Sequence, residues 1–238
     1  MANQKLDESV RGVFAISATP FTDDGAVDRA STDRMVEFYL ESGVTGLTIL
    51  GVMGEAPKMS PDESGAFCDQ VLRRVDERVP VVVGVSAPGL SAIESLTGRV
   101  MDLGAAGIMV SPMAGLRTDE AIEGYFHMVC DALGEVPIVL QDYPPASGVH
   151  MSVPLLNKLF ADLPSLISGE VICLADDVNV VISDSDPDRA RAIQAMPVRV
   201  RPRGRRPVGR SAPGCSRPTW AWTGRAMLEL RGERGDTR

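Results

Sequence analysis

Five short apolar segments recur along the chain, and a helix-like pattern separates each segment from the next. Their starts lie about 25 to 35 residues apart, which is the length of a β-strand followed by a helix. Both faces of each segment are apolar, as in parallel strands that helices cover. The expected strands are residues 12–17, 44–50, 79–85, 107–111 and 136–141. Such a series predicts an α/β fold.

Start and stop signals support the helices between these strands. Ser60, Pro61 and Glu63 form a capping-box pattern with proline at the first helical position. Ser91 and Glu94 repeat that pattern. Glycines are expected to end three helices, at Gly43, Gly104 and Gly134. A closed barrel and a doubly wound open sheet both fit these elements. The first expected strand is not followed by G-x-G-x-x-G, which argues against a dinucleotide-binding sheet.

Composition restricts the class of protein. The chain has 238 residues and 4 cysteines, and the cysteines show neither C-x-x-C nor metal-ligand spacing. A reduced, cytoplasmic location is therefore expected. Residues 1–11 lack the apolar core of a signal peptide, and no apolar run reaches the roughly 18 residues of a membrane span. His127 in a helix pattern and His150 in a loop are interpreted as surface or core residues. No metal or other cofactor is expected.

The character of the chain changes beyond Leu166. Residues 1–188 carry 11 Lys and Arg and 29 Asp and Glu, a net charge of −18, whereas residues 189–238 carry 13 Arg and 3 acidic residues, a net charge of +10. A basic tail suggests a nucleic-acid partner, a regulatory extension, or an out-of-frame or rearranged reading of a GC-rich gene. Abundant Arg, Pro and Gly without lysine favours the last. We expect residues 175–238 to form a disordered tail.

Candidate functional residues follow the expected strands, because a barrel of parallel strands carries its site at the strands' C-terminal ends. Gly51 and Gly54 bracket a tight turn after the second strand, where backbone N–H groups could hold a carboxylate or a phosphate. The alternative is a plain strand-to-helix turn. Tyr143 follows the fifth strand, where a phenol could shuttle protons. The alternative there is a packing tyrosine.

Several short motifs also occur in a specific order and spacing. They are Thr19-Pro20-Phe21, Gly51-x-x-Gly54-Glu55 with Ser60-x-x-Glu63, VVVGV at 81–85, Gly104-Ala105-Ala106-Gly107 before Ser111-Pro112, and Tyr143-Pro144-Pro145 before Gly148. In these motifs, residues 10–166 resemble the dihydrodipicolinate synthase / N-acetylneuraminate lyase family. The resemblance implies a (β/α)₈ barrel of the TIM type, usually tetrameric. Residues 1–174 would supply its first five to six βα units, as an incomplete lyase domain.

The resemblance also implies a chemistry. A lysine on the sixth strand forms a Schiff base with a 2-oxo acid such as pyruvate, and the imine allows a neighbouring bond to form or break. Tyr143 matches the position of a proton-relaying tyrosine. The turn formed by Gly51, Val52, Met53 and Gly54 matches the site that binds the substrate carboxylate. Related branches act on 2-keto-3-deoxy acids as aldolases or dehydratases.

Four positions depart from the family pattern. Val52 and Met53 stand where two hydroxyl residues are usual, and Met113 stands where a second tyrosine is often found. The Schiff-base lysine is expected near position 170, where the chain has Glu170, and the last lysine is Lys158. The sequence therefore predicts a lyase-family chain that is inactive on its own and prone to self-association. The alternatives are a reaction through another amine, such as the lysine at position 58, and nucleic-acid binding through the Arg-rich tail.

Overall fold

The structure, a computed structural model, describes residues 5–7, 10, 12–167 and, for the backbone alone, 180–183. One sheet has the strand order β5-β4-β3-β2-β1-β6. The first five strands run parallel to one another, and the sixth is antiparallel to the first. Their bounds are β1 (Gly12–Ile16), β2 (Gly46–Ile49), β3 (Val81–Gly84), β4 (Gly107–Val110), β5 (Ile138–Leu140) and β6 (Val180–Ser183). Each of the five expected strands is confirmed.

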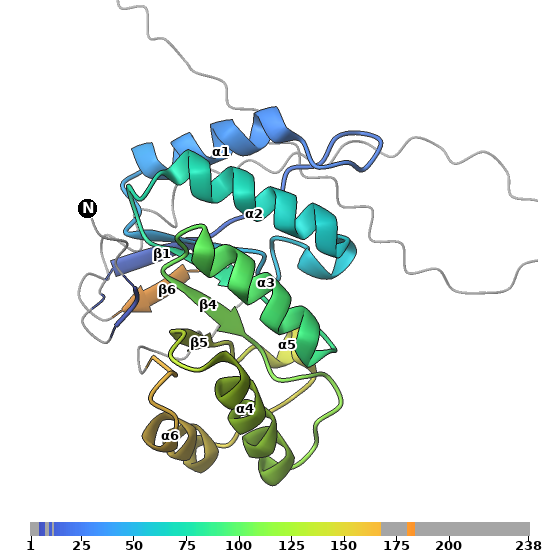
Figure 1. Ribbon diagram of the computed structural model, residues 1–238, viewed down its shortest axis with the longest axis vertical. Coiled ribbons are helices and arrows are strands. Elements are labelled where there is room, and N and C mark those ends of the chain that lie inside the picture. The colour runs from blue at the N-terminus through green and yellow to red at the C-terminus, as the bar shows by residue number, and fades with distance from the viewer. Residues whose placement is uncertain (1–4, 8–9, 11, 168–179, 184–238) are drawn as a thin grey trace, which may run out of the picture.

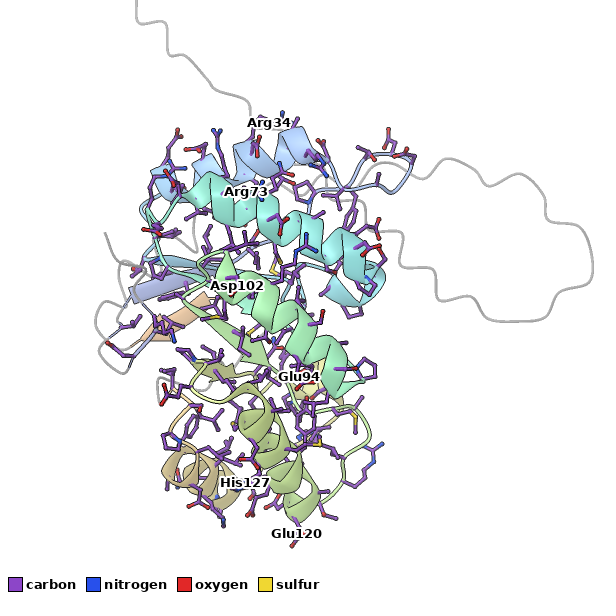
Figure 2. All side chains as sticks on the ribbon, viewed as in Figure 1. Arg34, Arg73, Glu94, Asp102, Glu120 and His127 are labelled. Carbon is purple, nitrogen blue, oxygen red and sulfur yellow. The ribbon has the colours of Figure 1, made fainter. Side chains whose placement is uncertain are left out.

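Helices alternate with the parallel strands and lie on one side of the sheet (Figure 1). Neighbouring helices contact each other in chain order from α1 to α4, and α6 packs beside α4. Figure 2 shows Arg34, Arg73, Glu94 and Asp102 on the solvent side of this layer. The bounds are α1 (Arg29–Glu41), the 3₁₀ helix η1 (Ala56–Lys58), α2 (Pro61–Val75), α3 (Leu90–Asp102), α4 (Asp119–Leu133), α5 (Pro144–Ser147) and α6 (Val153–Asp162).

The predicted capping box at Ser60 is confirmed. The Ser60 hydroxyl accepts from the Glu63 N–H at 3.2 Å, and the Glu63 carboxylate accepts from the Ser60 N–H at 2.9 Å. The second predicted cap, Ser91, is wrong, because α3 begins at Leu90 and its N-cap is Gly89. Gly89 already has the extended backbone that an N-cap needs, so the helix begins early enough for Leu90 to pack against the core.

The predicted glycine ends of the helices are also confirmed. Gly43 and Gly104 follow the last residues of α1 and α3 with φ of 75° and 94°, and Gly134 ends α4 with φ of 63°. Left-handed backbone at these points is most accessible to glycine. The helices therefore stop where the next strand must begin.

The core forms on both faces of the sheet, because alternate residues of each strand point to opposite sides. On the outer face, Leu47, Val83, Ile108 and Leu140 belong to the large apolar cluster beneath the helices. On the inner face, a smaller cluster contains Leu6, Phe14, Val82, Ala106 and Met109. Parallel strands that are apolar on both faces and alternate with helices form the first part of a (β/α)₈ barrel.

The two edges of the parallel sheet are occupied differently. Beside β5, Leu166 pairs in parallel with Ile138, and the Ile167 N–H donates to the Ile138 carbonyl at 2.9 Å. This is the position that a sixth parallel strand would take. Beside β1, β6 pairs antiparallel, with Gly12 opposite Ser183. β6 falls within the predicted tail; residues 168–179, including Glu170, and 184–238 lie outside the described residues.

Candidate functional site

The turn after β2 is held between two residues with left-handed backbone. Leu50 has φ of 54° and Glu55 has φ of 53°. This conformation costs a residue with a β-carbon roughly 1 to 2 kcal/mol, so the surrounding structure must enforce it. One restraint is the buried hydroxyl of Thr19, in the loop after β1, which donates to the Gly54 carbonyl at 2.7 Å. The turn between Leu50 and Glu55 is therefore restrained at both ends by the backbone and at Gly54 by the Thr19 hydroxyl.

Glycines allow the turn to lie directly on the neighbouring strand. A β-carbon on Gly84 of β3 would lie 2.2 Å from the Leu50 carbonyl oxygen, and one on Gly54 would lie 3.0 Å from the Leu50 backbone. The first distance is too short for a real side chain, and the second is tighter than most real contacts of a β-carbon. The predicted bracket of Gly51 and Gly54 is thus matched by a third glycine from another strand, which the sequence motif did not include.

The turn presents three consecutive backbone donors. The N–H groups of Val52, Met53 and Gly54 donate no hydrogen bond to any residue that the structure describes. The side chains of Val52 and Met53 are 42% and 43% exposed, whereas Gly54 is buried. Adjacent N–H groups without protein acceptors can bind an anion such as a carboxylate. In a plain strand-to-helix turn, these donors would bind water.

A polar row crosses the inner face at the C-terminal end of the sheet. Its members are Ser86, Ser111 and Gln141, which follow β3, β4 and β5. The Ser111 N–H and hydroxyl both donate to the Ser86 hydroxyl oxygen, at 2.9 and 3.1 Å. Gln141 lies beside Ser111 by the register that pairs Val110 with Leu140. Its side chain is a polar one in a buried place, since the residue is only 6% exposed.

Sequence reasoning missed Gln141 as a candidate residue. The sequence places Gln141 only as the last residue of an expected strand, and it indicates Tyr143, two residues later, as the candidate. A signal was present, because alternation along the fifth strand places Val139 and Gln141 on the inner face and Ile138 and Leu140 on the outer face. A polar residue at the end of a strand, in register with the residues of the inner face, is the pattern that predicts such a candidate.

Tyr143 lies just beyond β5, as the N-cap of the short helix α5. It is half-buried, and its carbonyl accepts from the N–H groups of Ala146 and Ser147 at 3.0 and 3.1 Å. Within the described residues no hydrogen bond joins its hydroxyl to the turn at 51–54. Its role as a proton relay stays a prediction.

Asp142, between Gln141 and Tyr143, has an unusual environment. Its Oδ1 atom is fully buried and has no hydrogen-bond partner in the part of the chain that the structure describes. Burial raises the pKa of this carboxyl, and the nearby charge of His150 acts in the opposite direction. The C-terminal end of β5 therefore carries a carboxyl group that resists ionisation, next to an uncharged amide.

Two of the described lysines, Lys58 and Lys158, form ion pairs with carboxylates. Lys58 ends η1, is exposed, and forms an ion pair with Glu55. Lys158 lies on α6 in the helix layer, and hydrogen bonds to the carboxylates of Asp162 and Glu123 raise its pKa to about 12. Lys158 is thus held as an ammonium group by two carboxylates.

One group of side chains has the composition of a metal site. The ligand atoms of Glu123, His127 and Asp162 lie within 4.8 Å of one another on α4 and at the end of α6. The ammonium group of Lys158 donates to both of these carboxylates and so supplies the positive charge itself. We interpret the group as a surface ion-pair network, which agrees with the expectation that His127 is a surface or core residue.

The fold and the turn together define a class: part of a parallel barrel, with a glycine-flanked turn at the C-terminal end of its second strand. Residues 9–171 match the Dihydrodipicolinate synthetase family, and the chain belongs to that family of lyases. This confirms the resemblance and the barrel-type fold. Among the described residues, no helix has both the length and the apolar character that crossing a bilayer requires.

Individual relatives agree with the family match. A solved dihydrodipicolinate synthase from Rhodopseudomonas palustris is 44% identical, with a TM-score of 0.65 over 67% of this chain and 53% of that one. The L-2-keto-3-deoxyarabonate dehydratase of Azospirillum brasilense is 35% identical over 64% of this chain and 50% of its own length. The prophage protein YagE of E. coli K12, solved with pyruvate, is 25% identical, with a TM-score of 0.62 over 69% and 55%. The chain spans about half the length of these relatives.

Proposed function

We propose that residues 51–54 bind the carboxylate of a 2-oxo acid such as pyruvate, on a lyase-family barrel unit that forms no Schiff base itself. The observation that carries this proposal is the set of three unpaired N–H donors between Leu50 and Glu55. A carboxylate would satisfy these donors without a basic side chain, and charge-assisted hydrogen bonds are the stronger kind. The pyruvate complex of the related protein YagE supports the choice of ligand.

We propose that the chain forms no imine because the sequence has no lysine where the family places one. A Schiff base begins with attack by an uncharged amine on the substrate carbonyl. The sequence has Glu170 near the expected lysine position and no lysine after Lys158. Lys158 has a pKa of about 12 and lies in the helix layer, and Lys58 is paired with Glu55. Tyr143 is still the proposed proton relay of the family site. Without an imine in this chain, it would have no proton to transfer there.

The first test is chemical trapping. The full chain is incubated with pyruvate, reduced with borohydride and analysed by mass spectrometry. We expect the mass to remain that of the unmodified chain. A stable adduct on Lys58 would show that the other amine reacts and would overturn the inactive assignment, and replacement by Lys58→Ala would identify the site.

The second test is binding. Pyruvate is titrated into the full chain, and amide shifts of the turn are followed by NMR. The change Gly54→Ala should abolish these shifts, because a β-carbon there meets the Leu50 backbone at 3.0 Å. Gly98→Ala on α3 is the control, since a β-carbon at Gly98 meets no atom within 4 Å. Pyruvate shifts that survive Gly54→Ala unchanged would contradict the assignment of the turn.

The wider predictions go with this proposal. We propose a lyase domain at residues 1–174 and a non-family tail at 175–238, in a cytoplasmic protein that associates with further copies of itself. The predicted homo-oligomer is checked by light scattering, where a monodisperse monomer would contradict it. Nucleic-acid binding through residues 189–238 concerns a segment outside the described residues; no observation favours it, and we do not propose it.

A further inference from the structure

The parallel sheet has two edges that a closed barrel would join. A TIM-type barrel has eight parallel strands, whereas the described residues supply five, from β1 to β5. At the β5 edge, Leu166 already pairs with Ile138 in parallel. At the β1 edge, the neighbour is the antiparallel strand β6. Closure therefore needs three more parallel strands, and the last of them would have to replace β6 beside β1.

The helix α6 has an apolar side that faces away from α4. Its other side is marked by Lys158, which donates to Glu123 of α4 at 2.9 Å. Val153, Leu156 and Phe160 follow one another at intervals of three and four residues, so they lie together on the side of α6 opposite Lys158. Val153 is 68% exposed, and Leu156 and Phe160 are half-buried. An apolar stripe of this kind is suited to packing against a neighbouring helix.

The helix α1 has a similar arrangement. Asp33 and Glu37 both bind side chains of α2. Phe38 lies about 100° round the helix from Glu37 and farther still from Asp33, so it faces away from α2. It is half-buried, packs against Tyr39 with ring centroids 5.6 Å apart, and belongs to neither apolar cluster of the described residues. α1 therefore also presents an apolar side chain on its outward side.

One partner of a particular size fits both places. α1 and α6 lie at opposite ends of the helix layer (Figure 1), where α1 follows β1 and α6 follows β5. A second copy of this chain does not fit, because two sets of five parallel strands exceed the eight of this barrel. A polypeptide of three βα units supplies the strands that are needed, and its helices can cover the apolar sides of α6 and α1.

We infer that the β5 and β1 edges, with α6 and α1 beside them, bind a second polypeptide of three parallel βα units that completes the barrel. Its first strand takes the position beside β5 that Leu166 and Ile167 begin, and its last strand displaces β6 from β1. In one respect the inference rests on the proposed function: the partner brings the amine of the Schiff base, while residues 51–54 hold the carboxylate.

Co-expression tests the docking. The full chain is produced together with the part of the Rhodopseudomonas palustris dihydrodipicolinate synthase that follows its match with this chain. Size-exclusion chromatography with light scattering should show a complex of one chain and one fragment. The control fragment is the matched part of the same enzyme, whose strands duplicate β1 to β5, and it should not bind. Absence of the complex, or equal binding of the two fragments, would overturn the inference.

Two substitutions test the apolar stripe of α6, with the dissociation constant measured by diluting the co-purified complex. Val153→Asp places a charge on the stripe and should weaken binding of the fragment about tenfold. Met128→Asp on α4 is the control and should leave the affinity unchanged. Both side chains are exposed, at 68% and 47%, so neither change should disturb the fold. An equal loss in the two variants, or no loss in Val153→Asp, would contradict the inference.

The displacement of β6 has a test of its own. Val181→Pro and Ile182→Pro each remove one backbone N–H from β6. Hydrogen bonding alternates between neighbouring residues of an antiparallel pair, so one of the two changes breaks the pairing with β1. That variant should bind the fragment about tenfold more tightly. Affinity that is unchanged or lower in both variants would show that β6 stays in place, and would overturn the inference.

Pyruvate trapping distinguishes the docking from the proposed function. The lysine of the fragment condenses with the 2-oxo carbonyl and releases water, and borohydride reduces the C=N bond to a stable amine. The adduct should form on the fragment in the complex, and Gly54→Ala should remove the adduct while the complex remains. A complex without an adduct would overturn the partner's supply of the amine. An adduct that survives Gly54→Ala would overturn the carboxylate turn and support the docking.

Discussion

The two faces of the parallel sheet are built from different kinds of side chain. On the outer face, strand residues such as Leu47, Ile49 and Ile108 are wholly buried beneath the helices. On the inner face, the corresponding positions include Gly84, and the row at the strand ends is polar. The outer face therefore has the side chains of a close-packed core, whereas the inner face has a smaller apolar cluster and, at the strand ends, hydrogen-bonding groups.

This difference separates stability from recognition. Helices packed on large aliphatic residues hold the strands at fixed spacing, and the inner face can then carry glycine and polar side chains. Stability should respond mainly to changes on the outer face, while ligand binding should respond to changes on the inner one. Four substitutions test this division, in order of decreasing effect on stability.

Phe126→Ala should have the largest effect. Phe126 of α4 is 0% exposed and packs edge-on against Tyr125, with ring centroids 5.3 Å apart. Removing a buried ring leaves a cavity and typically costs about 3 to 5 kcal/mol. Urea unfolding measures the loss, and Val139→Ala on the half-buried inner face should cost about 1 to 2 kcal/mol. Equal losses from the two changes would show that the faces do not differ in their contribution to stability.

Gly84→Ala should change both stability and ligand binding. The new β-carbon would lie 2.2 Å from the Leu50 carbonyl, so the turn must move. Overpacking of this kind costs about 1 to 3 kcal/mol, and pyruvate-induced NMR shifts at residues 51–54 should vanish. Gly124→Ala in α4 meets open space and should instead stabilise by about 0.5 to 1 kcal/mol, since alanine favours helix. Intact binding in Gly84→Ala would mean that the turn does not depend on this contact.

The outer face was largely predictable from the sequence, and the inner face was not. Runs of Val, Ile and Leu such as residues 79–85 are strand signals that depend only on local pattern. The capping box at Ser60 is likewise local, and it was found. The roles of Gln141 and Gly84 depend on neighbours about 30 residues away in the chain. Strand register brings these residues together, and no local sequence pattern predicts that register. The false cap at Ser91 shows the same limit, because the start of α3 is set by where Leu90 meets the core.

Thr19→Val should have an intermediate effect. It removes a buried 2.7 Å hydrogen bond and leaves the Gly54 carbonyl without that donor, at a cost of about 1 to 2 kcal/mol. Thr97→Val is the matched control, because the Thr97 hydroxyl is buried without a partner among the described residues. Its removal should be neutral or stabilising. The urea midpoint should fall for Thr19→Val and stay the same or rise for Thr97→Val. An unchanged midpoint for Thr19→Val would refute its role as a restraint on the turn.

Glu37→Gln, at the surface of the helix layer, should have the smallest effect and a characteristic pH dependence. Hydrogen bonds from Arg78 and Arg74 lower the pKa of Glu37 from 4.5 to about 2. A carboxylate whose pKa is lower in the folded state contributes stability above pH 4.5 and loses it as the pH falls toward 2. The unmodified chain should therefore be more stable than the variant at pH 7, and the difference should shrink by pH 2. Because the pair is exposed, 1 M salt should also reduce the difference at pH 7. Urea midpoints that differ by the same amount at both pH values would exclude this ion pair as the cause.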